Sequence, residues 1–247
     1  MYNVLESVKT WMNAWLAFVY PEFCQICATQ RATPGQSFIC SGCRSHVHFL
    51  DRPFCERCGF PYPGAISSSF ECSNCRGMEI HFETARSAVA AKDIVLEVIH
   101  RYKYHGAVWF EPFLAELLVR QAQGELNALD WDWIVPVPLH PKKYREREFN
   151  QAERLARPLS AATGIALNLR LLRRDLPTKT QTRLTREERQ ANVRQAFSPT
   201  RRGDVDGRRI VLVDDVFTTG ATTNACARAL KMAGASRVCV WTVARGI

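Results

Sequence analysis

The sequence has no hydrophobic run long enough to cross a bilayer, and it has no positively charged leader followed by a small-residue cleavage site. A transmembrane helix needs about 20 consecutive apolar residues, and a secretory signal needs both of the missing features. We therefore expect a cytoplasmic protein without stable membrane insertion; a peripheral position at the inner face of the membrane is the alternative. Apolar residues at helical spacing between Tyr2 and Tyr20 predict an amphipathic helix.

Excess positive charge is also missing from the first third of the chain. Residues 1–82 hold six Lys or Arg and six Asp or Glu, whereas residues 141–209 hold eighteen Lys or Arg against eight Asp or Glu. The second region therefore accounts for the whole net charge of +9. Such an excess favours an anionic ligand there. A solvated basic face explains the charge equally well.

A change in composition near residue 82 predicts two domains. A chain of 247 residues can form one good core and a small satellite. We assign residues 1–82 to an N-terminal helix and a cysteine module, and residues 83–247 to a larger domain.

The cysteine module holds eight of the ten cysteines, arranged as four Cys-x-x-Cys pairs. Two thiolates at this spacing can share one tetrahedral Zn²⁺ at about 2.3 Å each, and two pairs complete a structural site. The similar gaps between pairs favour sequential pairing, although interleaved pairing is possible. The predicted ligands are Cys24, Cys27, Cys40 and Cys43 for one ion, and Cys55, Cys58, Cys72 and Cys75 for the other.

Two other uses of these cysteines fit less well. Disulfides are disfavoured in a reducing cytosol, and the distance between the pairs disfavours an iron–sulfur cluster. Four-ligand sites leave no position for a catalytic water, so the zinc is predicted to be structural. Aromatic residues within the module are expected to form small cores; stacking on single-stranded bases is the weaker alternative. Cys226 and Cys239 lie in apolar patterns and are expected to be buried thiols.

From about Phe82 onward, short β-rich runs alternate with amphipathic stretches, which predicts a parallel, doubly wound α/β sheet. Ligands of such sheets bind beyond the carboxyl ends of the strands. The expected strands are Ser87–Ala91, Trp131–Pro136, Leu167–Leu172, Ile210–Val213 and Val238–Val243. The expected helices are Asp93–Tyr104, Phe110–Gln123, Asn150–Ala162 and Ala221–Ala233.

The run from Ile210 to Thr222 combines a buried strand, two carboxylates and a small-residue turn that enters a helix. The adjacent carboxylates of Asp214 and Asp215 repel each other, so they require hydroxyl donors or a cation nearby. The turn from Thr218 to Thr222 can close its backbone N–H groups around a phosphate at the helix N-terminus. This order predicts a site for a ribose 5-phosphate. The alternative is a strand followed by an ordinary capped helix, for which one Asp and one Thr would suffice.

The same run resembles the phosphoribosyl pyrophosphate (PRPP) motif of type I phosphoribosyltransferases, and the whole chain resembles the ComF family of competence proteins. Further blocks of this resemblance lie at residues 101–106, 135–140, 149–151 and 180–184. The implied fold is that of a type I phosphoribosyltransferase with an N-terminal double zinc ribbon. One departure is Glu148, where the family usually has Gly before the Phe-Asn-Gln block.

The resemblance implies roles for individual residues. Asp214 and Asp215 are expected to hold the ribose hydroxyls, and Lys103 and Arg147 to contact the pyrophosphate, which would carry Mg²⁺. The PRPP motif comprises Val213, Asp214, Asp215, Thr218, Thr219, Gly220, Ala221 and Thr222, and the pyrophosphate loop Pro138, Leu139 and His140. The implied flexible loop contains Thr180, Gln181, Thr182, Arg183, Arg186 and Arg189.

Three hypotheses for function follow. The family resemblance favours a PRPP-binding protein that acts in DNA uptake during natural transformation, handles single-stranded DNA and contacts a translocation or competence protein through its zinc module. A phosphoribosyltransferase of nucleotide metabolism with an unidentified acceptor is the second. The third is a non-catalytic zinc-ribbon adaptor.

Overall fold

The computed structural model describes residues 22–62, 64, 72–76, 79–176 and 195–247. The chain divides into two compact units, Met1–His46 and Val47–Ile247. The first unit contains the 3₁₀ helix η1 (Pro34–Gln36) and the short helix α2 (Ser41–Arg44). The helix predicted between Tyr2 and Tyr20 lies outside the described residues.

The second unit is built on a five-stranded sheet in the order β1-β7-β6-β2-β3. Every pairing in this sheet is parallel, so the carboxyl ends of its strands meet at one edge. The strands are β1 (Thr84–Ala90), β2 (Trp133–Pro136), β3 (Ala166–Leu167), β6 (Arg209–Phe217) and β7 (Arg237–Arg245). The predicted parallel α/β fold is confirmed.

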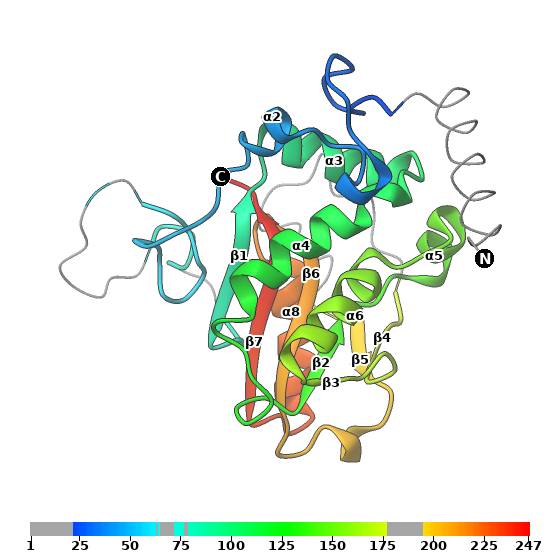
Figure 1. Cartoon of the computed structure of the whole chain (residues 1–247). Coiled ribbons are helices and arrows are strands. Elements are labelled where there is room, and N and C mark those ends of the chain that lie inside the picture. Colours follow the sequence, from blue (N-terminus) through cyan, green and yellow to red (C-terminus); the bar gives the residue numbers. More distant parts are fainter. Residues whose placement is uncertain (1–21, 63, 65–71, 77–78, 177–194) are drawn as a thin grey trace, which may run out of the picture. The chain divides into compact units, whose positions relative to one another are not determined.

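Helices cover both faces of this sheet (Figure 1). On one face, α4 (Glu111–Ala122) packs on β1 and β7, and α6 (Gln151–Thr163) on β2 and β6. Helix α8 (Ala221–Met232) packs on β6 and β7 from the other face, together with β5 (Phe197–Pro199). Covering both faces explains why the runs Ile210–Val213 in β6 and Val238–Trp241 in β7 are apolar at every position.

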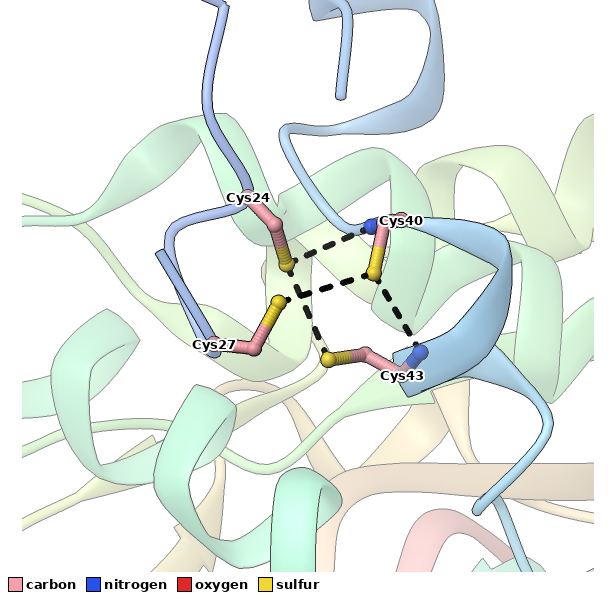
Figure 2. Close-up of side chains that lie close together, drawn as sticks. All are labelled: Cys24, Cys27, Cys40 and Cys43. Carbon is pink, nitrogen blue, oxygen red and sulfur yellow. Dashed lines mark hydrogen bonds between the residues drawn. The ribbon is translucent and has the colours of Figure 1, made fainter. Parts of the chain in front are cut away.

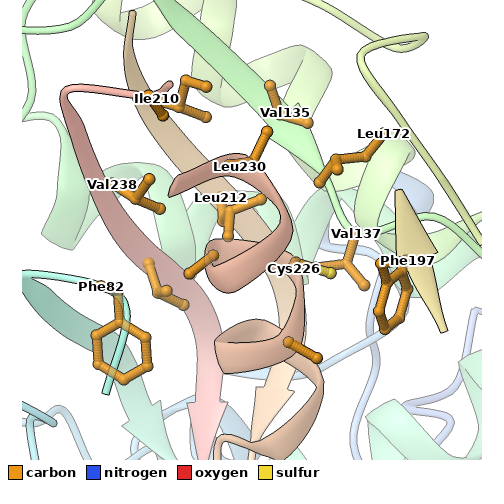
Figure 3. Close-up of a cluster of buried hydrophobic side chains, with 14 of the residues drawn as sticks. Phe82, Val135, Val137, Leu172, Phe197, Ile210, Leu212, Cys226, Leu230 and Val238 are labelled. Atoms are coloured by element: carbon orange, nitrogen blue, oxygen red, sulfur yellow. The ribbon is translucent and has the colours of Figure 1, made fainter. Parts of the chain in front are cut away.

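The core beneath α8 contains apolar side chains from α8, the sheet and the β4-β5 pair (Figure 3). Strand β4 (Leu172–Arg174) pairs with β5 in antiparallel fashion. Ile210 and Leu212 of β6 and Cys226 and Leu230 of α8 are completely buried in this core. Cys226 and Cys239 are 0% and 2% exposed, which confirms that both are buried thiols.

Several predicted bounds were wrong. The stretch Leu167–Leu172 is not one strand, because β3 ends at Leu167 and β4 begins at Leu172. Strand β6 continues to Phe217 instead of ending at Val213, since it pairs with β7 over its whole length. The sequence reading also missed helix α5 (Pro141–Arg147). Helix α3 (Asp93–Tyr104) has the predicted bounds.

The compact units do not coincide with the domains assigned from sequence. Residues 47–82, which include the second cysteine set, belong to the same unit as the sheet. The backbone N–H of Ala85 in β1 donates to the carbonyl of Arg57 at 2.8 Å, so this segment is hydrogen-bonded to the sheet. The boundary at 82/83 stays a prediction about sequence modules. None of the helices in the described parts of the chain is long and apolar enough to cross a membrane.

Candidate functional site

Asp214 and Asp215 lie near the carboxyl end of β6, the middle strand of the sheet. Side chains alternate along a strand, so Asp214 continues the face of Ile210 and Leu212 toward α8, and Asp215 leaves on the opposite face. Asp215 is only 6% exposed. The two carboxylates are adjacent in sequence but have different surroundings.

These surroundings change the protonation of Asp214. Desolvation raises the pKa of Asp214 to about 7; the negative charge of Asp215 acts in the same direction, and Lys103 opposes the shift. A carboxyl group with this pKa exists in both forms near neutral pH. It can therefore either donate a hydrogen bond to a ligand hydroxyl or accept one from it.

Lys103, in the last turn of α3, forms an ion pair with Asp215. Its Nζ lies 2.8 Å from Oδ2 of Asp215, and the two side chains are 18% and 9% exposed. The family resemblance predicts Lys103 as a pyrophosphate contact, but its pairing with Asp215 was not predicted. The pair brings a cation to the carboxyl end of β6, as the repulsion between the carboxylates requires.

Residues 218–222 follow β6 directly and enter α8. Gly220 has φ +74°, and a Cβ at this position would lie 2.3 Å from Cζ of Phe217, so only glycine fits. Thr219 Oγ1 accepts a hydrogen bond from the N–H of Ala221 at 3.4 Å. Backbone N–H groups in the first turn of a helix lack intrahelical partners and carry partial positive charge. The turn can therefore hold a phosphate.

The turn Pro138–His140 lies at the same edge of the sheet. Just before it, the N–H of Val137 donates to the carbonyl of Val213 at 2.9 Å. Asn150 caps α6 by accepting from Ala152 N, and its Nδ2 donates to the carbonyl of Val137 at 3.1 Å. This side chain thus joins α6 to the turn. The predicted pyrophosphate loop and the carboxylate pair are brought together by β2 and β6.

Arg147 and Glu148 lie at the end of α5. Arg147 Nη1 donates to Oε1 of Gln151 at 3.2 Å, and the guanidinium lies 5.1 Å from the centroid of the Tyr104 ring. Glu148 has φ +66°, in the left-handed region that glycine favours. The departure from the family pattern therefore falls at a position where a side chain is strained.

The implied flexible loop lies outside the described residues; it comprises Thr180, Gln181, Thr182, Arg183, Arg186 and Arg189. Strand β4 precedes this loop in the sequence and β5 follows it, and Arg174 of β4 pairs with Phe197 of β5. The Arg174 side chain contributes to the electrostatics around Asp214 and helps to restrain the rise of its pKa. The sequence reading did not select Arg174.

The first cysteine set brings its four sulfur atoms together (Figure 2). The Sγ atoms of Cys24 and Cys43 are 3.7 Å apart, and those of Cys27 and Cys40 are 3.8 Å apart. A zinc ion with four Zn–S bonds of about 2.3 Å requires sulfur–sulfur distances of about 3.8 Å. The set therefore fits structural zinc.

The second cysteine set has the same geometry but is more deeply buried. The Sγ atoms of Cys55 and Cys75 are 3.9 Å apart, and those of Cys58 and Cys72 are 3.4 Å apart. All four residues are buried, whereas Cys27 and Cys43 of the first set are partly exposed. The sequential pairing of the Cys-x-x-Cys motifs is confirmed.

One buried residue beside the second set was missed by sequence analysis. Arg245, at the end of β7, is 1% exposed and donates from Nη1 to the carbonyl of Cys58 at 2.8 Å. Its Nη2 lies 3.6 Å from Sγ of the same cysteine. An arginine that directly follows the apolar pair Val243 and Ala244 was a signal that could have drawn attention to it.

Comparisons with known proteins agree with these two components. The double zinc ribbon domain matches residues 15–76, and the phosphoribosyl transferase domain matches residues 152–246. Competence protein F of Haemophilus influenzae is 30% identical over 223 residues, which are 85% of this chain and 97% of that protein. The chain belongs to the ComF family.

Other relatives of this ComF-family chain are similar over most of their length. The DNA utilization protein YhgH of Escherichia coli is 31% identical over 228 residues, covering 91% of this chain and 97% of that protein. Competence protein ComFC of Bacillus subtilis is 27% identical and covers 84% of both chains.

Two solved structures match part of the chain at low TM-scores. The PRPP amidotransferase of B. subtilis is 26% identical with a TM-score of 0.35, and the match covers 53% of this chain but only 25% of that protein. A purine phosphoribosyltransferase of Pyrococcus horikoshii is 16% identical with a TM-score of 0.33, covering 56% and 83%.

Proposed function

We propose that this protein binds PRPP at the carboxyl edge of its sheet and acts in DNA uptake during natural transformation. One observation carries the binding proposal: β6 presents Asp214 and Asp215 immediately before a glycine-containing turn that begins helix α8. A ribose 5-phosphate needs acceptors for its hydroxyls and N–H donors for its phosphate, and this run supplies both in order.

The bound PRPP would contact four parts of the chain. Asp214 and Asp215 hold the 2′- and 3′-hydroxyls, and residues 218–222 hold the 5′-phosphate. The turn Pro138–His140 and Lys103 contact the pyrophosphate. Mg²⁺ travels with the pyrophosphate and is held mainly by ligand oxygens and water, as this ion prefers. Arg147 is a weaker candidate for the pyrophosphate, because its guanidinium already lies against Tyr104 and Gln151.

The role in transformation rests on the relatives, whose names place one in competence and another in DNA utilization. The protein would work in the cytoplasm, and the zinc ribbons would contact a competence or translocation protein.

Calorimetry tests the binding proposal. Wild type is titrated with PRPP and Mg²⁺, in parallel with Asp214→Asn/Asp215→Asn and with Asp204→Asn as a matched control. Asp204 is exposed and precedes β6 at its other end. We expect binding by wild type and the control, and at least a 30-fold loss in the double variant. Absence of binding by wild type would overturn the proposal.

Transformation frequency tests whether the site matters for uptake. The double Asp variant is compared with a deletion and with Asp204→Asn in a naturally transformable host. We expect the double variant to approach the deletion. Full transformation by the double variant would instead support the zinc-ribbon adaptor.

Handling of single-stranded DNA is a second candidate, favoured by the surface of α5. Lys142, Tyr144 and Arg145 are exposed there. Basic and aromatic side chains together suit a single strand, through backbone charge and base stacking. Replacing Lys142 and Arg145 by Gln is expected to weaken the affinity and to lower the slope of log affinity against log salt concentration by about 1.4. An affinity that does not change with salt contradicts this proposal.

Transfer of the phosphoribosyl group to an unidentified acceptor is the remaining alternative. It predicts pyrophosphate release from PRPP that depends on an added nucleophile and is lost in the double Asp variant. PRPP binding without release under any acceptor would favour a ligand role.

A further inference from the structure

The ends of strands β6 and β7 connect the second cysteine set to the turn that begins α8. Phe217, the last residue of β6, pairs in register with Arg245, the last residue of β7. Beyond these residues both strands end: β6 leads into the turn at 218–222, and β7 leads to Gly246. Whatever fixes Phe217 and Arg245 therefore also fixes the start of the turn.

The Arg245 side chain is held by the second zinc ribbon. Its guanidinium donates to Cys58 and lies 5.4 Å from the centroid of the Phe60 ring and 4.4 Å from that of Phe217. Its buried Nε has no hydrogen-bond partner among the described residues. A buried cation requires a partner, and a zinc ion with four thiolates carries two net negative charges. The cysteine set supplies that partner.

Phe217 also contacts the turn at 218–222, so it links Arg245 to this turn. Its ring lies so close to Gly220 that an added Cβ would be 2.3 Å from Cζ. The backbone N–H of Gly246 donates to the carbonyl of Phe217 at 3.0 Å, and the Cα of Thr218 lies within 3.6 Å of a Cβ built on Gly246. The ring of Phe217 is also packed edge-on against Phe82. The turn thus contacts the ring of Phe217, and the same ring contacts the guanidinium of Arg245.

A small cavity shows that no other layer separates the cysteine set from the turn. Its volume is about 80 Å³, and its lining includes Cys58, Cys75, Phe217, Thr218, Thr219 and Arg245. Thiol groups of the second set and hydroxyl-bearing residues of the turn therefore line the same space.

We infer that Arg245 is a positioning residue that couples the second zinc set to the phosphate-binding turn, so that metal at Cys55, Cys58, Cys72 and Cys75 strengthens binding of a sugar 5′-phosphate. The inference rests on the proposed function for the identity of the ligand. The coupling is reciprocal: a ligand in the turn slows loss of zinc from the second set.

The test compares Arg245→Met with Arg237→Met. Arg237 lies at the opposite end of β7, where it also contacts an aromatic ring, Trp131, and pairs with Glu83. Calorimetry measures the affinities for ribose 5-phosphate and for magnesium pyrophosphate. We expect Arg245→Met to weaken ribose 5-phosphate binding at least 10-fold and leave pyrophosphate binding within 2-fold, with Arg245→Lys intermediate. Arg237→Met is expected to change neither.

An unchanged affinity for ribose 5-phosphate in Arg245→Met would overturn the inference, as would an equal loss for both ligands, which indicates general destabilisation. If wild type binds neither ligand, the proposed function fails, and hydrogen exchange then tests the coupling by itself. Exchange at the amides of residues 217–224 should rise at least 10-fold in Arg245→Met and Cys75→Ser, but not in Arg237→Met or Cys43→Ser. Unchanged exchange in Arg245→Met rejects the coupling.

Discussion

The two zinc ribbons have the same local geometry but different surroundings. In the first, the N–H of Ala28 donates to the carbonyl of Cys24 at 2.9 Å; in the second, the N–H of Gly59 donates to Cys55 at 2.8 Å. Both residues follow the second cysteine of a knuckle and have positive φ, +56° and +67°. The turn that presents the ligands is therefore the same in both.

The difference lies in what surrounds each turn. A Cβ on Gly59 would lie 2.6 Å from the carbonyl oxygen of Ala85 in β1, whereas Ala28 carries a Cβ at the matching position. The second ribbon is thus in close contact with the sheet and has Arg245 against its Cys58. The comparison teaches that similar metal sites can have different roles: one organises its own unit, and the other is part of the domain that carries the candidate site.

The largest effect is expected when one cysteine ligand is removed from each ribbon in turn. A structural zinc contributes roughly 10–16 kcal/mol of apparent binding free energy. Cys75→Ser is therefore expected to lower the free energy of unfolding of unit 47–247 by more than about 3 kcal/mol, and Cys43→Ser to leave it unchanged. Urea unfolding is followed by the fluorescence of the tryptophans in this unit, with Trp11 and Trp15 replaced by Phe; they are Trp109, Trp131, Trp133 and Trp241. If both substitutions lowered the unfolding free energy of unit 47–247 equally, the two ribbons would not differ in their contribution to this unit.

A smaller perturbation targets the contact between the second ribbon and the sheet. Gly59→Ala introduces a Cβ at positive φ against a backbone oxygen, so we expect a loss of about 2–3 kcal/mol in the unfolding free energy of unit 47–247. Urea unfolding measures it, and zinc content is determined in parallel. Gly64→Ala is the matched control, since Gly64 also has positive φ but nothing lies within 4 Å of its added Cβ. A loss no larger than that of the control would mean that the contact with Ala85 is unimportant.

The raised pKa of Asp214 predicts that the free energy of unfolding of unit 47–247 depends on pH. The folded state raises the pKa of this carboxyl above its usual value to about 7. Protonation of Asp214 therefore stabilises the folded state. The stabilisation is complete below about pH 4 and is lost as pH rises through 7. Asp214→Asn should therefore gain stability over wild type on the order of 2 kcal/mol at pH 8 and little at pH 4.5.

The measurement is urea unfolding of wild type and Asp214→Asn between pH 4.5 and 8. Asp204→Asn provides the control for loss of an exposed carboxylate. A constant difference between wild type and Asp214→Asn across this range would show that Asp214 titrates normally.

The smallest effects are expected where a side chain occupies the left-handed region without a close neighbour to exclude it. Ala28→Gly in the first ribbon and Glu148→Gly at the end of α5 should each stabilise their unit by about 0.5–1 kcal/mol. Thermal unfolding detects such a change as a rise in Tm. A fall in Tm for Ala28→Gly would mean that the two knuckles differ in the turn itself, and not only in surroundings.

Much of the candidate site could be predicted because its signals are local. The Cys-x-x-Cys spacing determines which thiolates can share an ion, and the apolar run before Asp214 identifies a buried strand that leads into a helix. The bounds of β6 could not be predicted, because pairing with β7 extends it through the polar residues to Phe217.

Spacing and local composition were enough to predict the cysteine sets, the alternation of strands and helices, and the order of the carboxylates and the turn. Three features required the folded structure: the different surroundings of Asp214 and Asp215, the pairing of Lys103 with Asp215, and the contact of Arg245 with Cys58 across 187 residues of sequence. Such contacts depend on how distant segments pack, and no spacing along the chain encodes that packing.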